Sequence, residues 1–222
     1  MMTSKDKIVK TEFDFGYAKW KEVPEVAKLA LENQKGDVLD VGCSTCQLAS
    51  FMRENGWKGK YFGIDLLKHE GHDYPKEIDL VIGDAVTMPF PEVDTVVMYD
   101  ILEHVDDPAA LLSKALKAAR SNVLIKVPLR NEEMWNLGVV EPHQKDRTHK
   151  HAGFSREEVR KLVELSGGSV AKSRDLDRID ATTTVKLWRS RFAMKLHYLL
   201  AKMFSSREFH ATLWCEVVRA SR

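Results

Sequence analysis

The chain has 222 residues, of which 44% are hydrophobic and 30% charged, so it is long enough to bury a core as one domain. Its 34 basic and 33 acidic residues nearly balance, which gives no general attraction to nucleic acid. No apolar run approaches the length of a membrane span, the polar start lacks the apolar core of a signal peptide, and three cysteines form no even-numbered disulfide framework. We therefore expect a cytoplasmic protein.

The first half of the chain alternates between helix and strand patterns. Apolar residues spaced along one face predict a helix over 16–33, and the short apolar run at 38–42 predicts a buried strand. The elements expected next are a helix over 46–55, strands over 61–65, 78–84 and 93–100, a helix over 107–120 and a strand over 122–128. Strands separated by helices favour a mainly parallel sheet with right-handed crossovers.

The second half begins with the clearest helix, over 155–166. Ser155 is suited to cap it, acids stand in its first turn, and two glycines follow its end. Two further strands are expected over 169–176 and 209–219, with a helix at about 184–204 between them.

Carboxylates recur where the first four expected strands end, at Asp40, Asp65, Asp84 and Asp100. Aspartate is common at strand ends, so one of them would mean little, but open parallel sheets bind ligands at this edge. Asp65 stands 25 residues after Asp40, close to the separation at which a carboxylate binds a ribose diol. The glycine pattern does not match the dinucleotide fingerprint, and no Walker lysine is present. These observations predict a nucleoside site.

The segments VLDVGCSTC, YFGIDL, VIGDAVTMPFP and VDTVVMYDILEHVDDP occur in this order and carry a resemblance to a known family. They resemble successive motifs of the class I S-adenosylmethionine-dependent methyltransferases, especially the small-molecule, type 11-like branch, over about residues 36–168. The resemblance implies an α/β fold, a Rossmann-like three-layer sandwich with a mostly parallel seven-stranded sheet and an antiparallel last strand. It also implies S-adenosyl-L-methionine as the cofactor.

The same resemblance divides the chain and assigns residues to the cofactor. One domain, 1–222, would comprise an N-terminal helix at 15–35, a cofactor-binding half at 36–130 and a substrate-side half at 131–222. Asp65 would hold the ribose hydroxyls, and Asp84 with the Ala85 backbone would meet the adenine. The methionine end would lie against Asp40, Gly42, Ser44, Met98 and Tyr99, and Leu66 completes the expected cofactor contacts.

The loop GCSTC at 42–46 departs from the Gly-x-Gly-x-Gly often found in this family. Ser44 and Cys46 would either adopt less demanding backbone angles than glycine or narrow the pocket, and Cys46 is expected to begin a helix and pack. A redox pair of Cys43 and Cys46 would suit a thioredoxin-like fold, which does not explain the row of acids. A zinc site would need two further ligands, and the available spacings match no standard pattern. We therefore expect no metal.

Methyl transfer to a hydroxyl requires an aligned acceptor and a group that removes its proton. His104 is one candidate, because its segment borders the active site in related enzymes, although it would equally suit a capping or packing role. His149 is the preferred candidate: related enzymes often have a histidine shortly before the Phe and Ser or Thr that open the next helix. It stands in the polar loop 141–154, which would look much the same if it were only solvated.

The leading hypothesis is a methyltransferase that acts at an oxygen of a small-molecule or lipid-linked acceptor. Methylation of RNA or protein is the alternative, but no Asn-Pro-Pro-Tyr-like motif follows the fourth strand. A non-catalytic, methyltransferase-like binding protein is a further alternative, supported by the altered glycines. The expected helix at 184–204 interleaves basic and aromatic residues, which suits a solvated lid or a peripheral contact with an anionic membrane or nucleic acid.

Overall fold

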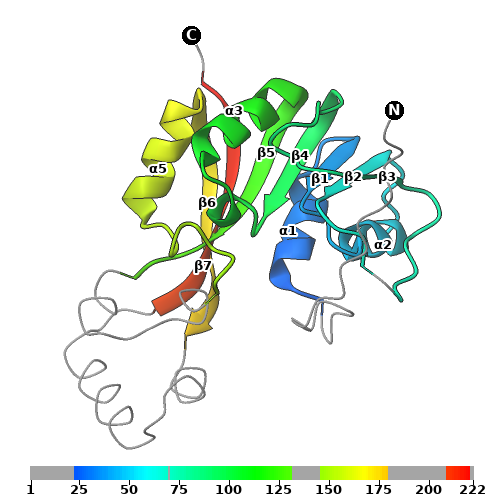
Figure 1. The fold of residues 1–222 in the computed structure, drawn as a ribbon, viewed down its shortest axis with the longest axis horizontal. Helices are drawn as coiled ribbons and strands as arrows, with labels where there is room; N and C mark the ends of the chain where they lie inside the picture. Colours follow the sequence, from blue (N-terminus) through cyan, green and yellow to red (C-terminus); the bar gives the residue numbers. More distant parts are fainter. Residues whose placement is uncertain (1–22, 70, 132–145, 180–208, 221–222) are drawn as a thin grey trace, which may run out of the picture.

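The computed structural model describes residues 23–69, 71–131, 146–179 and 209–220. Its elements are α1 (Glu25–Asn33), β1 (Val38–Val41), α2 (Gln47–Glu54), β2 (Tyr61–Asp65), β3 (Asp79–Ile82), β4 (Val93–Tyr99), the 3-10 helix η1 (Leu102–His104), α3 (Pro108–Ala118), β5 (Ala119–Pro128), α5 (Arg156–Leu165), β6 (Gly168–Ile179) and β7 (Phe209–Arg219). The strands form one sheet in the order β3-β2-β1-β4-β5-β7-β6 (Figure 1).

The sheet is parallel except for its last strand. β1 pairs in parallel with β2 and β4, β2 with β3, and β4 with β5. β7 enters between β5 and β6 and runs antiparallel to both. The seven-stranded, mostly parallel sheet with an antiparallel last strand is therefore confirmed.

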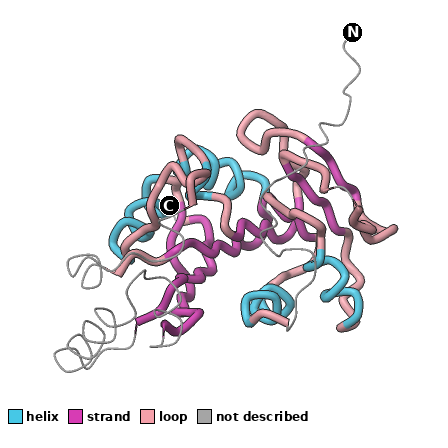
Figure 2. Tube along the Cα trace, turned by 60° about the horizontal axis from the view of Figure 1, so that its bottom comes forward, coloured by secondary structure: helices cyan, strands magenta, loops and turns pink. Residues whose placement is uncertain are grey.

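Helices cover both faces of the sheet, which confirms the three layers (Figure 2). Successive strand residues point to opposite faces, and β4 shows the result. Val96 and Met98 belong to the core beneath α3 and α5, whereas Val97 belongs to the core beneath α1 and α2. Each face is thus sealed by its own apolar cluster, and the chemistry is left to the loops at the sheet edge.

Local signals explain most helix ends. Ser155 and Glu158 form the reciprocal capping box of α5, and the Asp107 side chain accepts a hydrogen bond from the Ala110 N–H at the start of α3. The expectation of one continuous helix over 16–33 was wrong at Val23 and Pro24, which are not helical. α1 begins at Glu25, because Pro24 has an extended backbone (ψ 148°) that stands outside the helix.

Strand boundaries differ from expectation by a few residues. β5 begins at Ala119 rather than 122, directly after α3, while β3 is shorter than expected and β6 longer. Residues 16–22 and the expected helix at 184–204 lie outside the described residues. None of the described helices is long and apolar enough to cross a membrane.

A buried polar network ties several elements together at the edge opposite the four aspartates. Asn122 of β5 accepts a hydrogen bond from the Thr95 hydroxyl (2.7 Å) and donates to Glu216 (2.7 Å) and to the Asn33 carbonyl (2.9 Å). Lys172 pairs with the other Glu216 oxygen at 2.9 Å. One amide therefore connects α1, β4 and β7 to β5.

Candidate active site

The four aspartates lie at one edge of the sheet, as expected. The strand order β3-β2-β1-β4 places Asp84, Asp65, Asp40 and Asp100 at or just beyond the carboxyl ends of four neighbouring strands. Their surroundings differ, however, and the differences assign each carboxylate a separate role.

Asp65 has the geometry of a ribose-binding carboxylate. One of its oxygens accepts the Ser44 N–H at 2.7 Å and the other accepts the Leu67 N–H at 3.0 Å. Each carboxylate oxygen has two lone pairs, so these contacts fix the group and leave acceptor capacity for a diol. The Leu66 side chain beside it is 63% exposed. The two residues offer a polar and an apolar contact side by side, which fits a nucleoside.

The loop after β1 has left-handed backbone angles at the three positions where the family often has glycine, although only the first of them is a glycine here. Gly42, Ser44 and Cys46 all have left-handed φ angles, of 80°, 49° and 57°. Of the two alternatives for Ser44 and Cys46, these angles exclude the first, a less demanding backbone. The reason is the tight turn in which the Gly42 N–H bonds the Ile64 carbonyl (2.7 Å), since it demands this backbone whatever the side chains.

The two cysteines of this loop pack in the core. Their sulfur atoms lie 3.3 Å apart, both thiols are free, and Cys46 is fully buried as the N-cap of α2. A Cβ built on Gly63 would lie 2.9 Å from the Cys43 sulfur, so the thiols fill the space above that glycine. The Cys46 contact and burial raise the pKa of Cys43. The expectation that Cys46 begins a helix and packs is confirmed.

Asp40 turns inward instead of facing the edge. It is 6% exposed and accepts a short hydrogen bond from the Tyr61 hydroxyl. Burial raises its pKa to about 7, although the bond from Tyr61 acts in the opposite direction. The sequence did not reveal this partner, because Tyr61 reads as an ordinary apolar residue at the start of a strand.

Asp84 is exposed and organises its own turn. One carboxyl oxygen accepts the Val86 N–H at 2.8 Å, and the Asp84 carbonyl accepts the N–H of Met88. The Lys114 ammonium donates a hydrogen bond to the Ala85 carbonyl at 2.7 Å. Val86 is 53% exposed, so an apolar side chain again lies next to an edge carboxylate.

Met98 and Tyr99 end β4 at the same edge, and the side chain of each is engaged within the protein. The paired register of β1 and β4 stops at Asp40 and Val97, one residue before them. The Met98 side chain is fully buried, and the Tyr99 hydroxyl accepts a hydrogen bond from Trp214 at 3.2 Å. This arrangement is compatible with the backbone contacts that the resemblance implies.

The two candidate histidines lie together. The rings of His104, in η1, and His149 are 4.5 Å apart and nearly perpendicular. Asp146, which the sequence analysis missed, has one oxygen 3.7 Å from His149 Nε2 and accepts the Thr148 hydroxyl on the other at 2.6 Å. The carbonyl of Glu103 accepts the N–H groups of residues 150 and 151 and fixes the loop against η1.

This group adjoins the loop after β1. A Cβ built on Gly42 would lie 3.3 Å from the Ile101 side chain, so the loops that follow β1 and β4 touch. Asp100, which opens the β4 loop, has a left-handed φ of 51° and forms an ion pair of 2.6 Å with Lys126. Burial lowers the pKa of Lys126, but the charge and hydrogen bond of Asp100, together with the charges of Asp177 and Glu103, outweigh it and leave that pKa raised. The sequence did not single out Lys126, because it interrupts an apolar strand.

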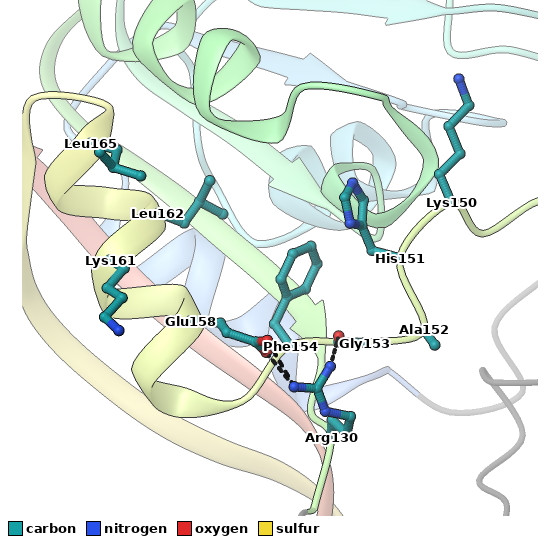
Figure 3. Close-up of a pocket in the computed structure, with 10 residues that line it drawn as sticks. All are labelled: Arg130, Lys150, His151, Ala152, Gly153, Phe154, Glu158, Lys161, Leu162 and Leu165. Carbon is teal, nitrogen blue, oxygen red and sulfur yellow. Dashed lines mark hydrogen bonds and ion pairs between the residues drawn. The ribbon is translucent and has the colours of Figure 1, made fainter.

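A separate hollow of about 450 Å³ opens between the loop 150–154 and α5 (Figure 3). Arg130 lies in it and binds both carboxyl oxygens of Glu158, at 2.7 and 2.8 Å. Phe154 and Leu162 supply apolar walls. None of the residues expected to bind the cofactor lines this hollow, so we do not assign it to the nucleoside.

Comparison with known proteins agrees with this geometry. Residues 16–173 match the family model described as a methyltransferase domain. A search of curated proteins finds no match.

Three solved structures illustrate the likeness in fold. A chain from the complex between the Trm112 methyltransferase activator of Haloferax volcanii and a putative methyltransferase is 19% identical, with 88% of this chain and 89% of that chain covered and a TM-score of 0.61. Magnesium protoporphyrin IX methyltransferase of Synechocystis with bound S-adenosylhomocysteine is 17% identical, with 88% and 80% covered and a TM-score of 0.54. The O-methyltransferase NcsB1 from neocarzinostatin biosynthesis, in complex with S-adenosylhomocysteine and 1,4-dihydroxy-2-naphthoic acid, is 16% identical, with 83% and 49% covered and a TM-score of 0.52.

Proposed function

Because this chain belongs to the methyltransferase domain family, in its class I, S-adenosylmethionine-dependent form, we propose that it methylates an oxygen of a small-molecule or lipid-linked acceptor. The cofactor supplies an activated methyl group on a positively charged sulfur. The protein then has to hold the cofactor, align the acceptor and remove its proton.

We assign the cofactor to the edge formed by β1 to β4. Asp65 keeps lone pairs for the ribose hydroxyls, and the exposed Leu66 and Val86 side chains, at the ends of neighbouring strands, would enclose the adenine. Asp84 and the backbone of Ala85 would meet the polar edge of the base. The methionine end would lie over the loop from Gly42 to Ser44 and the backbone at Met98 and Tyr99.

The observation that carries oxygen as the acceptor atom is the pair of histidines beside this edge. His149 lies between His104 and the Asp146 carboxylate, an arrangement in which the carboxylate orients the imidazole. Such a histidine is suited to take the proton of a hydroxyl. Two neighbours in fold, a magnesium protoporphyrin IX methyltransferase and an O-methyltransferase with a dihydroxynaphthoic acid, act on or bind small molecules.

The test combines calorimetry with a turnover assay on the full chain. S-adenosylmethionine and S-adenosylhomocysteine should bind the wild type, and Asp65→Asn should weaken binding about 10- to 100-fold because hydrogen bonds to a charged acceptor are lost. A screen of hydroxyl-bearing acceptors with methyl-labelled cofactor should find turnover. His149→Ala should reduce that turnover by about 100-fold or more and leave cofactor affinity within about twofold.

Asp79→Asn is the matched control, since Asp79 is an exposed carboxylate at the opposite end of β3. It should change neither affinity nor turnover. The altered glycine loop favours one competing function, a binding protein without catalysis. If S-adenosylmethionine binds but no acceptor is methylated, the result would support a non-catalytic binding protein. If S-adenosylmethionine does not bind, the assignment of the cofactor to the edge formed by β1 to β4 is rejected.

We also place the protein in the cytoplasm. Its three cysteines are all free, although two of them lie 3.3 Å apart, which is the state expected in a reducing compartment.

A further inference from the structure

Glu103 is a buried carboxyl group without the partners that such a group requires. Its residue is 0% exposed, and neither of its side-chain oxygens has a hydrogen-bonding partner among the described residues. Buried carboxylates are normally paired, hydrogen-bonded or bound to a metal ion. Burial, and next the charge of Asp100, raise the pKa of Glu103 to about 8. The burial of Glu103 therefore destabilises the folded protein, and no hydrogen bond from the described residues offsets this cost.

The same carboxyl group faces two imidazoles. One oxygen of Glu103, one nitrogen of His104 and one nitrogen of His149 all lie within 4.8 Å of one another. Ligand-to-metal distances of about 2.0–2.2 Å place three ligand atoms about 3.3–3.8 Å from one another, so a contraction of up to about 1 Å would close the group around an ion.

Outer contacts hold these side chains in place. His104 Nδ1 lies 3.2 Å from the Thr148 hydroxyl, so its Nε2 is the nitrogen that we assign to an ion. His149 Nε2 lies 3.7 Å from the Asp146 carboxylate, so we assign the other ring nitrogen of His149, Nδ1, to the ion. Carboxylates and hydroxyls that bind the distal nitrogen of a ligating histidine are typical of metal sites. The Glu103 carbonyl, which accepts the N–H groups of Lys150 and His151, fastens the loop of His149 to η1.

We propose that Glu103, His104 and His149 bind a divalent transition-metal ion at the acceptor side of the methyl-transfer site. Two imidazoles and one carboxylate favour Mn²⁺, Fe²⁺, Co²⁺ or Zn²⁺ over Mg²⁺ and Ca²⁺, and they leave coordination positions open. This inference revises the expectation of a metal-free protein. Metal binding itself stands on the geometry, whereas its role rests on the proposed function.

That role concerns the acceptor oxygen. A hydroxyl bound to the ion at an open position loses its proton more easily, and the proton leaves to solvent while the ion keeps its charge. The oxygen then attacks the methyl carbon, a C–O bond forms as the C–S bond breaks, and S-adenosylhomocysteine leaves with the electron pair on sulfur. In the metal-loaded protein the two histidines act as ligands, and the acceptors that fit best carry a second oxygen able to chelate.

The test uses the full chain, stripped with EDTA and desalted, without cofactor or acceptor. Calorimetry and thermal unfolding are followed on addition of Mn²⁺, Co²⁺, Zn²⁺ or Mg²⁺ alone. The transition metals should bind and raise the melting temperature, and bound Co²⁺ should give an absorption spectrum of a site with mixed nitrogen and oxygen ligands. Glu103→Gln and His149→Asn should each weaken binding more than about tenfold.

The metal-free melting temperature of Glu103→Gln guards against a folding defect. Because glutamine has nearly the same shape as glutamate, that temperature should not fall below that of the wild type, while the response to metal is lost. His72→Gln and Glu77→Gln change the same residue types outside the group and should respond to metal like the wild type.

No metal response in the wild type, or a response that survives both Glu103→Gln and His149→Asn, overturns the proposal. Calorimetry with S-adenosylmethionine on the same samples separates the two hypotheses. Cofactor binding without metal binding leaves His149 as the proton acceptor and rejects only the metal site. Metal binding without cofactor binding retains the site and rejects the proposed methyl transfer.

Discussion

The backbone of Ser44 shows how far a side chain can depart from a family pattern while the loop keeps its shape. A left-handed φ costs a non-glycine residue about 1–2 kcal/mol, and here it aims the Ser44 N–H at Asp65. The carboxylate that we assign to the ribose is thus oriented by a strained residue.

This strain predicts a substitution pattern at position 44. Ser44→Gly should change the free energy of unfolding by less than about 1 kcal/mol, because relief of strain is offset by a more flexible unfolded chain. Ser44→Val should lower it by about 1–3 kcal/mol, since a β-branched residue fits this region poorly. Urea unfolding measures both.

Ser50→Val, in the ordinary helical backbone of α2, serves as the control and should cost less than about 1 kcal/mol. Equal effects of valine at positions 44 and 50 would show that the left-handed angle carries no penalty.

At this scale the sequence indicates which residues reach the edge but not which way they face. The motif order predicts both Asp40 and Asp65 at the cofactor, but Asp65 is partly exposed whereas Asp40 is only 6% exposed. The parallel register pairs Asp40 with Gly63, so Tyr61, two residues before Gly63, lies on the same face of the sheet as Asp40 and within reach of it. A pairing between positions 21 residues apart has no signature in a single sequence. Asp146 was missed for a similar reason: it contacts Thr148 and His149 close by in the chain, but only the fold brings these residues beside His104.

At the scale of elements, the polar network around Asn122 is the main cross-link of the sheet. It joins β5 to β4 and β7 and holds the end of α1. Asn122→Ala should lower the free energy of unfolding by about 2–3 kcal/mol, because it removes the three buried hydrogen bonds that Asn122 makes with Thr95, Glu216 and Asn33. Chemical denaturation with matched slopes is the measurement.

Asn55→Ala provides the comparison. Asn55 also donates to a carbonyl, that of Phe51 at 2.8 Å, but it is exposed, so water replaces the lost bond. Its substitution should cost less than about 1 kcal/mol. A cost at Asn122 no larger than at Asn55 would contradict the role of the network.

The sequence predicted the elements well where the signal was local. The capping box at Ser155 fixed the start of α5, and β7 appeared with the expected boundaries. Helix 16–33 was overextended because its apolar spacing continues across Pro24, whose extended backbone ends the helical pattern. The insertion of β7 between β5 and β6 was suggested only by the family resemblance, because periodicity carries no information about strand order.

At the scale of the whole molecule, two buried carboxyl groups make stability depend on pH. Asp40 and Glu103 have folded-state pKa values of about 7 and about 8, above those of the unfolded chain. The folded state therefore holds these protons more tightly, and the free energy of unfolding should fall as pH rises from about 4 to about 8. The decline should slow once both groups are ionised.

Asp40→Asn isolates one part of this dependence. In EDTA, the variant should gain about 2–4 kcal/mol over the wild type at pH 8 and almost nothing at pH 4. Asp94→Asn should behave in the opposite way, because the Arg120 hydrogen bond lowers the pKa of Asp94 and its stabilisation is present above pH 4. Parallel stability curves for the Asp40 variant and the wild type would contradict the burial of a titrating carboxyl group.

The place of β7 in the sheet has a consequence for biosynthesis. β6 leaves the ribosome well before β7, yet β7 is its only neighbour among the strands that the structure describes, and β7 also covers the edge of β5. A nascent chain interrupted before Phe209 therefore carries an uncovered β5 edge and an unpaired β6, both open to association with other chains. Such a chain would depend on chaperones until its last strand is translated.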